Sequence, residues 1–370
     1  MKYYIIAGEA SGDLHASNLM AGLKKLDGQA DFRCWGGDLM EGQGAKLVRH
    51  YRDLAFMGFA EVLANIRAIF SNLRFCKKDI LGYRPDVVIL VDYPGFNLRM
   101  AKFAHQQGLK VFYYISPQVW AWKKNRVKKI KKYVDRMFVI LPFEKGFYKK
   151  YGIDADFVGH PLLDALKAQQ KKQGNPEIFR KTNNLGQRPV IALLPGSRKQ
   201  EIGKMLQVMV SIVPGYPQFQ FVVAGAPSIP KSFYKTIIGD VDVKLVFDGT
   251  HGLLVIAHAA LVTSGTATLE TALMNVPEVV CYKGSNFSYQ IAKRVVKVKY
   301  ISLVNLIMDR KIVEELIQDE MNTTRLKQEF DKILDGKNRQ KIFKDYKDLK
   351  EKLGGSGASE IAAALMVGYL

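Results

Sequence analysis

Residues 263–270 read Thr263-Ser264-Gly265-Thr266-Ala267-Thr268-Leu269-Glu270. An apolar run at 259–262, typical of a buried strand, leads into this stretch, and an apolar, helix-forming run at 269–274 continues from it. A turn of small residues between a strand and a helix leaves backbone N–H groups unpaired at the N-terminus of the helix. These groups and the helix dipole favour a bound anion, so the stretch predicts an α/β fold with a phosphate-binding turn.

Glu270 adds a second element of recognition, because it follows the turn by one helical turn. An ionised carboxylate only accepts hydrogen bonds, which suits two neighbouring hydroxyls of a sugar. A phosphate and a diol bound side by side indicate a nucleotide diphosphate and its ribose. An ordinary capped helix with an exposed glutamate gives the same pattern, so this stretch alone leaves both interpretations open.

Strand-like and amphipathic segments alternate along the chain, which is the signature of βαβ units. In the first half we expect strands at 3–7, 31–35, 87–91, 111–115, 136–140 and 156–158. Residues 162–188 are polar and are interpreted as a linker, and further strands are expected at 190–194, 218–223, 243–247, 260–262 and 278–282. Charged helices follow from about Arg325, and an apolar helix at 361–367 comes last. The pattern predicts two Rossmann-like domains facing a cleft, with ligands beyond the carboxyl ends of the strands.

Composition narrows the class of protein. The chain has 370 residues, of which 48% are hydrophobic, enough for two cores. No apolar run reaches the length of a membrane span, and the first residues are too quickly polar for a signal peptide. Cys34, Cys76 and Cys281 are far apart and odd in number, which argues against a disulfide framework and indicates a reducing cytoplasm. The formal net charge of +20 indicates an anionic partner: nucleic acid, an acidic membrane or a phosphorylated substrate.

Two strand ends in the first half carry carboxylates. The turn Gly8–Asp13 lacks the glycine spacing of a dinucleotide site, and Glu9 and Asp13 would repel a diphosphate, so with Ser11 they suit a sugar. Ser11 as a helix cap is an equally valid interpretation. Asp92 ends a strand just before a Pro-Gly turn, where it could act as a general base towards an attacking hydroxyl or merely cap the turn.

The second half opens on a further strand-turn-helix transition, Leu194–Glu201. Arg198 could hold phosphate oxygens in a bidentate fork, or could be an ordinary surface arginine. We expect no catalytic metal. The acid-x-acid pattern at Asp240–Asp242 leads into a strand instead of ending one, and the histidines include no H-x-x-x-H pair.

Two segments suit a membrane surface. Residues 59–75 carry an apolar face at helical spacing, which includes Val62, Ile66, Ile69 and Phe70 and would usually be core. Trp120 and Trp122 precede a run of ten residues, 123–132, of which seven are basic, including Lys128 and Lys129. Tryptophans beside a polybasic run are typical of a membrane interface, although a solvated helix face is the simpler interpretation. Nucleic-acid binding is less favoured, because no recognised module accompanies the charge.

Seven of these motifs, in this order and at this spacing, resemble the lipid-A-disaccharide synthase family of GT-B glycosyltransferases. The motifs are Gly8–Asp13, Asp92–Asn97, Ser116–Trp122, Leu141–Glu144, Gly159–Pro161, Leu194–Arg198 and Ser264–Glu270. The resemblance implies transfer of the sugar of UDP-2,3-diacylglucosamine to 2,3-diacylglucosamine 1-phosphate, giving a β-1,6-linked lipid A precursor and UDP. It implies no cofactor, and a cytoplasmic enzyme attached peripherally to the inner membrane; a homodimer is compatible with it.

The resemblance also assigns roles and boundaries. It implies that Asp92 is the general base and that Glu9, Ser11 and Asp13 lie on the acceptor side, in a domain of residues 1–165. A C-terminal helix, about 345–370, would return to that domain, and residues 185–344 would bind the donor. Implied contacts to UDP come from Gly196, Ser197, Arg198, Ser264, Gly265, Thr266 and Glu270. Three alternatives stay open: another UDP-N-acetylglucosamine transferase, a UDP-sugar epimerase of the same fold, and a basic membrane-surface or nucleic-acid-binding protein without turnover.

Overall fold

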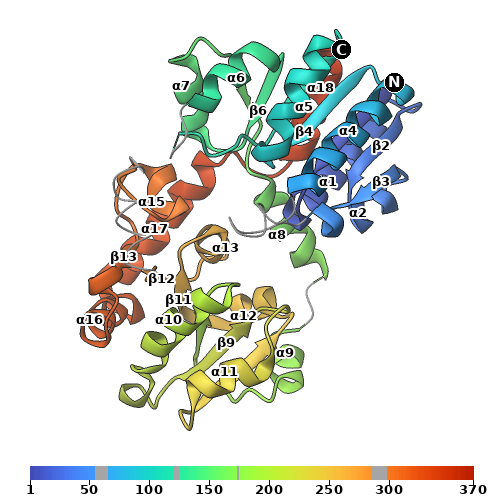
Figure 1. Cartoon of the computed structure of the whole chain (residues 1–370). Coiled ribbons are helices and arrows are strands. Elements are labelled where there is room, and N and C mark those ends of the chain that lie inside the picture. The colour runs from blue at the N-terminus through green and yellow to red at the C-terminus, as the bar shows by residue number, and fades with distance from the viewer. Residues whose placement is uncertain (55–65, 121–124, 173–174, 285–297) are drawn as a thin grey trace. The chain divides into compact units, whose positions relative to one another are not determined.

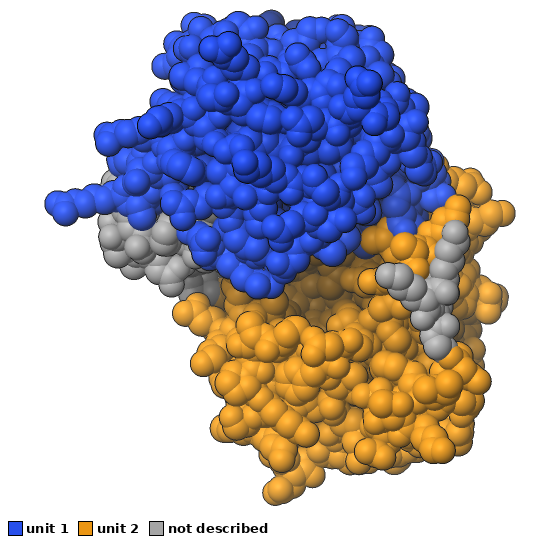
Figure 2. Space-filling model, turned by 90° about the vertical axis from the view of Figure 1, so that its right-hand side faces the viewer, with its two compact units in different colours: residues 1–164, 353–370 blue, residues 165–352 orange. Residues whose placement is uncertain are grey.

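The computed structural model describes residues 1–54, 66–120, 125–172, 175–284 and 298–370 (Figure 1). The chain divides into two compact units, which Figure 2 distinguishes by colour. Unit 1 comprises residues 1–164 and 353–370, and unit 2 comprises residues 165–352. Each unit is an α/β sandwich built on its own parallel sheet.

Unit 1 holds a sheet in the order β3-β2-β1-β4-β5-β6-β7 among its described residues. Its strands are β1 (Lys2–Ala7), β2 (Asp31–Gly36), β3 (Lys46–His50), β4 (Val87–Val91), β5 (Lys110–Tyr114), β6 (Arg136–Val139) and β7 (Ala155–Phe157). Its helices are α1 (Ala10–Leu26), α2 (Asp38–Gly42), α4 (Ile66–Tyr83), α5 (Pro94–Gln106), α6 (Asn125–Tyr133), α7 (Pro142–Lys149) and α18 (Ala358–Gly368). The order reverses between β1 and β4, so their carboxyl ends lie side by side at the switch point where ligands bind in such sheets.

Successive side chains of β1 point to opposite faces of the sheet, so the core of unit 1 has two layers. Tyr4 and Ile6 pack with residues of α4, α5 and α6, whereas Tyr3, Ile5 and Ala7 pack with α1 and α18. Both faces of the sheet are therefore covered, which explains why β4 reads as the continuous apolar run Val87–Val91.

The C-terminal helix α18 belongs to unit 1 and packs on α1. Gly22 makes this close approach feasible, because a Cβ there would lie 3.0 Å from the Cβ of Ala363. The predicted return of an apolar C-terminal helix is confirmed.

Unit 2 holds a sheet in the order β10-β9-β8-β11-β12-β13 among its described residues. As in unit 1, the strand order reverses next to the first strand of the unit, here between β8 and β11. Its strands are β8 (Val190–Leu194), β9 (Gln220–Gly225), β10 (Val243–Phe247), β11 (Ala257–Thr263), β12 (Glu278–Tyr282) and β13 (Glu314–Ile317). Its helices are α9 (Pro176–Thr182), α10 (Lys199–Val210), α11 (Lys231–Ile238), α12 (Thr250–Ile256), α13 (Thr266–Leu273), α15 (Leu303–Met308), α16 (Thr323–Leu334) and α17 (Gly336–Lys352), and α8 (Pro161–Lys172) enters it from unit 1.

The two predicted Rossmann-like halves are confirmed, with two corrections. The stretch 162–188 is not a plain linker, because α8 and α9 occupy most of it. The strands β3 and β13 are additions at the sheet edges, pairing with β2 and β12 respectively. Both are short and charged, as edge strands commonly are, so they lack the apolar run that marks a central strand.

Candidate active site

Asp92 lies at the switch point of the sheet in unit 1. It directly follows Val91, the last residue of β4, and Val91 pairs with Ala7 at the end of β1. Glu9, two residues beyond Ala7, therefore lies beside Asp92, close enough for its charge to influence the Asp92 carboxyl. The sequence analysis placed these carboxylates at two strand ends, and the pairing of β1 with β4 makes the two ends neighbours.

The turn that carries Asp92 has an unusual backbone. Asp92 and Tyr93 both adopt left-handed conformations, with φ angles of 43° and 46°. Such angles are uncommon outside glycine and cluster at functional sites. Gly8 is required opposite this turn, because a Cβ there would lie 2.3 Å from the Tyr93 ring.

Asn97 and Tyr113 hold this turn in place. The fully buried Asn97 amide donates to the main-chain oxygens of Asp92 at 2.8 Å, Val91 at 3.1 Å and Ile6 at 3.3 Å. The Tyr113 hydroxyl donates to the same Asp92 oxygen at 2.5 Å. The sequence analysis assigned no role to either residue, although Asn97 ended a quoted motif; its contacts depend on the position of β1 in the sheet.

Burial raises the pKa of Asp92 from 3.8 to about 6, and the negative charge of Glu9 adds to the effect. A carboxylate with a pKa near 6 is a stronger base than an ordinary aspartate and is still ionised at neutral pH. Asp92 therefore has the properties of a general base.

Glu9 and Ser11 are exposed at the start of α1, where a polar ligand could reach them. Asp13 is different. It is 2% exposed, and its carboxylate accepts from the backbone N–H groups of Gly37, Leu39 and Met40, at 2.8, 3.1 and 3.1 Å. Asp13 therefore caps α2, and the sequence could not indicate those distant partners.

The two predicted phosphate turns of unit 2 line a single cavity of about 340 Å³. They meet because β8 and β11 are adjacent strands and each turn follows the carboxyl end of one of them. Residues from both turns line the cavity, namely Gly196, Ser197, Ser264, Gly265 and Thr266. Gly196 adopts a φ of 104°, which explains the glycine in the first turn.

Ser264 supports this cavity through its internal hydrogen bonds. Its backbone N–H donates to the oxygen of Cys281 at 3.0 Å, and its hydroxyl donates to the oxygen of Ile301 at 2.9 Å. The N–H groups that the helix N-terminus offers to an anion are therefore those of the next residues, Gly265 and Thr266.

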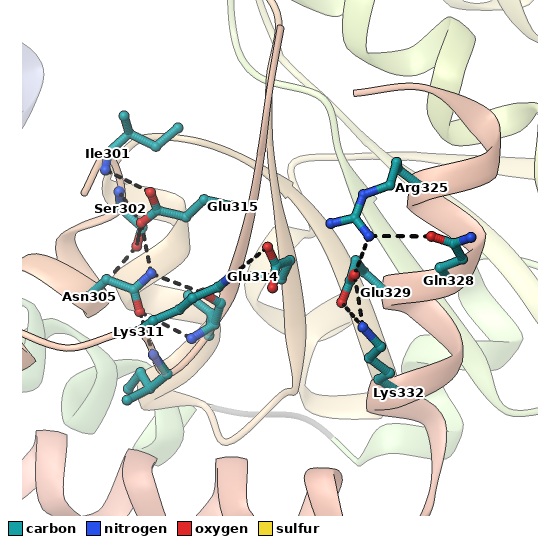
Figure 3. A network of polar contacts seen from close by, with 12 residues as sticks. Ile301, Ser302, Asn305, Lys311, Glu314, Glu315, Arg325, Gln328, Glu329 and Lys332 are labelled. Carbon is teal, nitrogen blue, oxygen red and sulfur yellow. Dashed lines mark hydrogen bonds and ion pairs between the residues drawn. The ribbon is translucent and has the colours of Figure 1, made fainter. Parts of the chain in front are cut away.

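Glu315 on β13 fixes the segment to which Ser264 is bonded (Figure 3). One oxygen accepts from the Ile301 N–H at 2.9 Å. The other accepts from the N–H and hydroxyl of Ser302, at 3.0 and 2.7 Å, and from the Asn305 amide at 2.8 Å. A carboxylate with four donors is firmly held, so the Ile301 oxygen offers Ser264 a fixed acceptor. Nothing in the sequence motifs pointed to Glu315.

Arg198 and Glu270 complete the predicted donor-binding set. Arg198 precedes α10, its side chain is 73% exposed, and within the described residues its guanidinium contacts Glu201 at 3.5 Å. Such a guanidinium is free to turn onto a ligand. Glu270 lies on α13 and is largely buried, which raises its pKa.

The predicted membrane residues differ from one another in how exposed they are. Val62 and Trp122 lie outside the described residues, and Ile66 begins α4. Phe70 on α4 is 60% exposed, whereas Ile69 packs against the core. Lys128 and Lys129 are exposed on α6.

Trp120 is corrected from membrane contact to core. Its side chain is 9% exposed, its indole N–H donates to the Glu144 carboxylate at 3.1 Å, and its ring packs edge-on against Phe143. Burial raises the pKa of Glu144 to about 7.

Among the described residues, no three histidine, cysteine or acidic side chains gather in a group suited to a metal ion. In the same part of the chain, no helix combines the length and apolar character needed to cross a bilayer.

Comparisons with known proteins agree with the geometry. A family model described as "Lipid-A-disaccharide synthetase" matches residues 3–367. The lipid-A-disaccharide synthase of Syntrophus aciditrophicus is 40% identical over 98% of this chain and 96% of its own length. That of Geobacter metallireducens is 38% identical over 99% and 96%.

Solved structures share the fold at lower identity. The UDP-GlcNAc 2-epimerase of Neisseria meningitidis bound to UDP-GlcNAc has a TM-score of 0.67 at 14% identity, covering 100% of both chains. The calicheamicin glycosyltransferase CalG4 has a TM-score of 0.62 at 15% identity, covering 100% of this chain and 98% of its own. These likenesses support a GT-B fold, in which each of two α/β halves is built on a parallel sheet.

Proposed function

Since the chain belongs to the lipid-A-disaccharide synthase family, we propose that it joins UDP-2,3-diacylglucosamine to 2,3-diacylglucosamine 1-phosphate through an inverting displacement with Asp92 as the base. The chain is a glycosyltransferase that acts on a UDP-sugar donor and a lipid acceptor. The match over residues 3–367 is the observation that carries this function. The site residues and the mechanism are our inference from the geometry.

The acceptor's 6-hydroxyl attacks the anomeric carbon of the donor. As the new C–O bond forms, the proton of that hydroxyl passes to the Asp92 carboxylate and the bond from the anomeric carbon to the UDP oxygen breaks. Attack from the face opposite UDP inverts the configuration, giving a β-1,6 linkage. General base assistance of this kind is typically worth about a hundred- to ten-thousandfold in rate.

The cavity of unit 2 binds the donor in this proposal. The backbone N–H groups of Gly265 and Thr266 and the guanidinium of Arg198 hold the diphosphate as negative charge builds on the leaving group. Fixed donors aimed at such charge contribute about 3 kcal/mol each to lowering a barrier. Glu270 accepts from the ribose hydroxyls, and Ser264 positions the turn.

The acceptor binds to unit 1, where Glu9 and Ser11 are exposed at the start of α1 and Glu9 lies near Asp92. Unit 1 is thus the acceptor domain and unit 2 the donor domain. This division follows from the chemistry at each switch point: carboxylates beyond β1 and β4 suit the hydroxyl groups of the acceptor sugar, and an amide-rich turn beyond β11 suits a diphosphate.

Both substrates carry acyl chains, so we place the chain at the surface of the inner membrane as a peripheral protein. The exposed Phe70 on α4 and the exposed Lys128 and Lys129 on α6 support this attachment. A homodimer, which is compatible with the family resemblance, would be detected as a doubled mass in sedimentation equilibrium.

Release of UDP from the acylated donor tests the function. The proposal predicts UDP and disaccharide in equal amounts, and only when the acceptor is present. Turnover of the unacylated donor, or a 2-epimer formed without an acceptor, would support the rival transferase or epimerase instead.

A further inference from the structure

A cavity of about 630 Å³ lies between α4, α5 and α6 of unit 1, away from the carboxyl ends of β1 and β4 where Asp92 lies. This volume is in the range of pockets that bind small molecules. The cavity is lined by Phe70, Leu73, Arg74, Lys77, Leu98, Arg99, Lys102, Phe103, Gln106, Lys129 and Tyr133. The mechanism proposed above uses none of the charged residues among them.

The charge of this cavity is one-sided. Five of its lining residues are cationic, Arg74, Lys77, Arg99, Lys102 and Lys129, and no carboxylate lines it within the described residues. Lys77 lies over the Phe103 ring at 5.2 Å from its centroid, and Arg99 donates to the Gly95 oxygen at 2.5 Å. These contacts orient the two cations without neutralising them, so the cavity attracts an anion.

The cavity also has an apolar part. Leu73 and Leu98 are buried at 6% and 7% exposure and form apolar lining. Phe70 also lines the cavity and is 60% exposed. A large apolar side chain this exposed beside a cationic cavity suits a ligand with one anionic group and an apolar tail.

We propose that this cavity binds the headgroup phosphate of an anionic glycerophospholipid in the bilayer, with the acyl chains alongside Phe70. Arginine holds phosphate oxygens in a bidentate fork and lysine as a point charge. The surplus of positive charge repels the ammonium of a zwitterionic headgroup, so the cavity selects lipids with net negative charge. This inference rests on the proposed membrane attachment and gives it a specific ligand. A nucleic acid, whose bases also stack on exposed aromatic rings, is less favoured because no recognised nucleic-acid-binding module accompanies the charge, and the test below distinguishes the two ligands.

The test is co-sedimentation of the full chain with vesicles of phosphatidylcholine alone, or with about one third phosphatidylglycerol. The cavity variant is Arg74→Gln/Lys77→Gln/Lys102→Gln. The control is Lys337→Gln/Lys341→Gln/Lys344→Gln, which removes the same charge from exposed positions on α17 of unit 2. We expect wild type and control to bind the anionic vesicles within about twofold of each other, and the cavity variant to bind at least about tenfold more weakly. None should sediment with phosphatidylcholine alone.

Equal losses in both variants would show a general effect of net charge and overturn the proposal, as would an unchanged cavity variant. So would a cavity variant that loses binding to a single-stranded RNA but keeps the vesicles. UDP release from substrates dispersed in detergent should be the same in all three proteins, which also shows that the cavity variant is folded. If the wild-type protein binds no vesicle, both the proposed membrane attachment and the lipid site are wrong. If the wild-type protein binds anionic vesicles but releases no UDP, the proposed function is wrong and the lipid site is not affected.

Discussion

The side-chain amide of Asn97 donates a 2.8 Å hydrogen bond to the main-chain oxygen of Asp92. This bond crosses a turn in which Asp92 has a φ of 43°, so a buried amide stabilises a conformation that an aspartate rarely adopts. Residues that no substrate touches therefore set the position of the base.

Replacing Asn97 or Tyr113 should reduce the stability of the folded chain. Asn97→Leu leaves three main-chain oxygens without the amide, which should reduce the free energy of unfolding by about 3 kcal/mol. Tyr113→Phe removes a single donor to the Asp92 oxygen and should cost about 1 kcal/mol. Urea unfolding measures both. If Asn97→Leu were as stable as wild type, the clamp on the turn would be immaterial.

Asp92→Asn should separate chemistry from binding. Turnover should fall by about a hundred- to ten-thousandfold, because the amide cannot accept the proton. Binding of UDP, measured by calorimetry, should change less than about twofold, since the proposed donor residues all lie in unit 2. Full turnover in this variant would show that another group is the base.

The same variant should be more stable than wild type at high pH. Burial raises the pKa of Asp92 to about 6 in the folded chain, above its value of 3.8 in the unfolded chain, so ionisation disfavours the folded state. The penalty is absent below about pH 3, where both states are protonated, and is complete above about pH 7. At pH 8 we expect Asp92→Asn to gain roughly 3 kcal/mol in the free energy of unfolding, and little at about pH 3.

The pH profile of activity follows from the same carboxyl. The ratio kcat/KM should rise with pH through an apparent pKa of about 6, as Asp92 becomes ionised. Glu9→Gln removes the neighbouring negative charge and should move this inflection to lower pH. A shift to higher pH, or none, would mean that Glu9 does not face the base.

Glu315 offers a test of the support behind the phosphate turn. Glu315→Gln cannot keep all four donors satisfied, so the Ile301 segment and with it Ser264 should loosen; we expect UDP to bind about tenfold more weakly, a change of about 1.4 kcal/mol. Glu314→Gln is the matched control, because within the described residues the Glu314 carboxylate pairs with Lys311 at 2.7 Å and not with the Ile301 segment. Equal UDP affinity in both variants would remove Glu315 from the donor site.

Much of the fold could be predicted from the sequence, because both sheets are parallel and covered on both faces. Their central strands, such as β4 and β8, are continuous apolar runs with a turn at each end. The edge strands β3 and β13 lack such runs, since half of their surroundings is solvent or charge. The helices α8 and α9 were missed because their polar composition resembles that of a linker.

Within the candidate site, the sequence could predict where a functional residue lies in the fold but not which residues it bonds to. A strand followed by a small-residue turn places Asp92 and Ser264 at strand ends from local sequence alone. The tasks of Asp13 and Trp120 depend on residues 24 positions away or more, Gly37 and Glu144, which only the folded chain brings near. Asn97 and Glu315 escaped notice for the same reason.

The most direct test of the central claim is the rate of disaccharide formation from acylated donor and acceptor, measured for wild type and Asp92→Asn with and without a chelator. The account predicts acceptor-dependent turnover by wild type that is unaffected by the chelator, and a loss of about a hundredfold or more in the variant. Wild type that releases no UDP, or a variant that matches wild type, would contradict it.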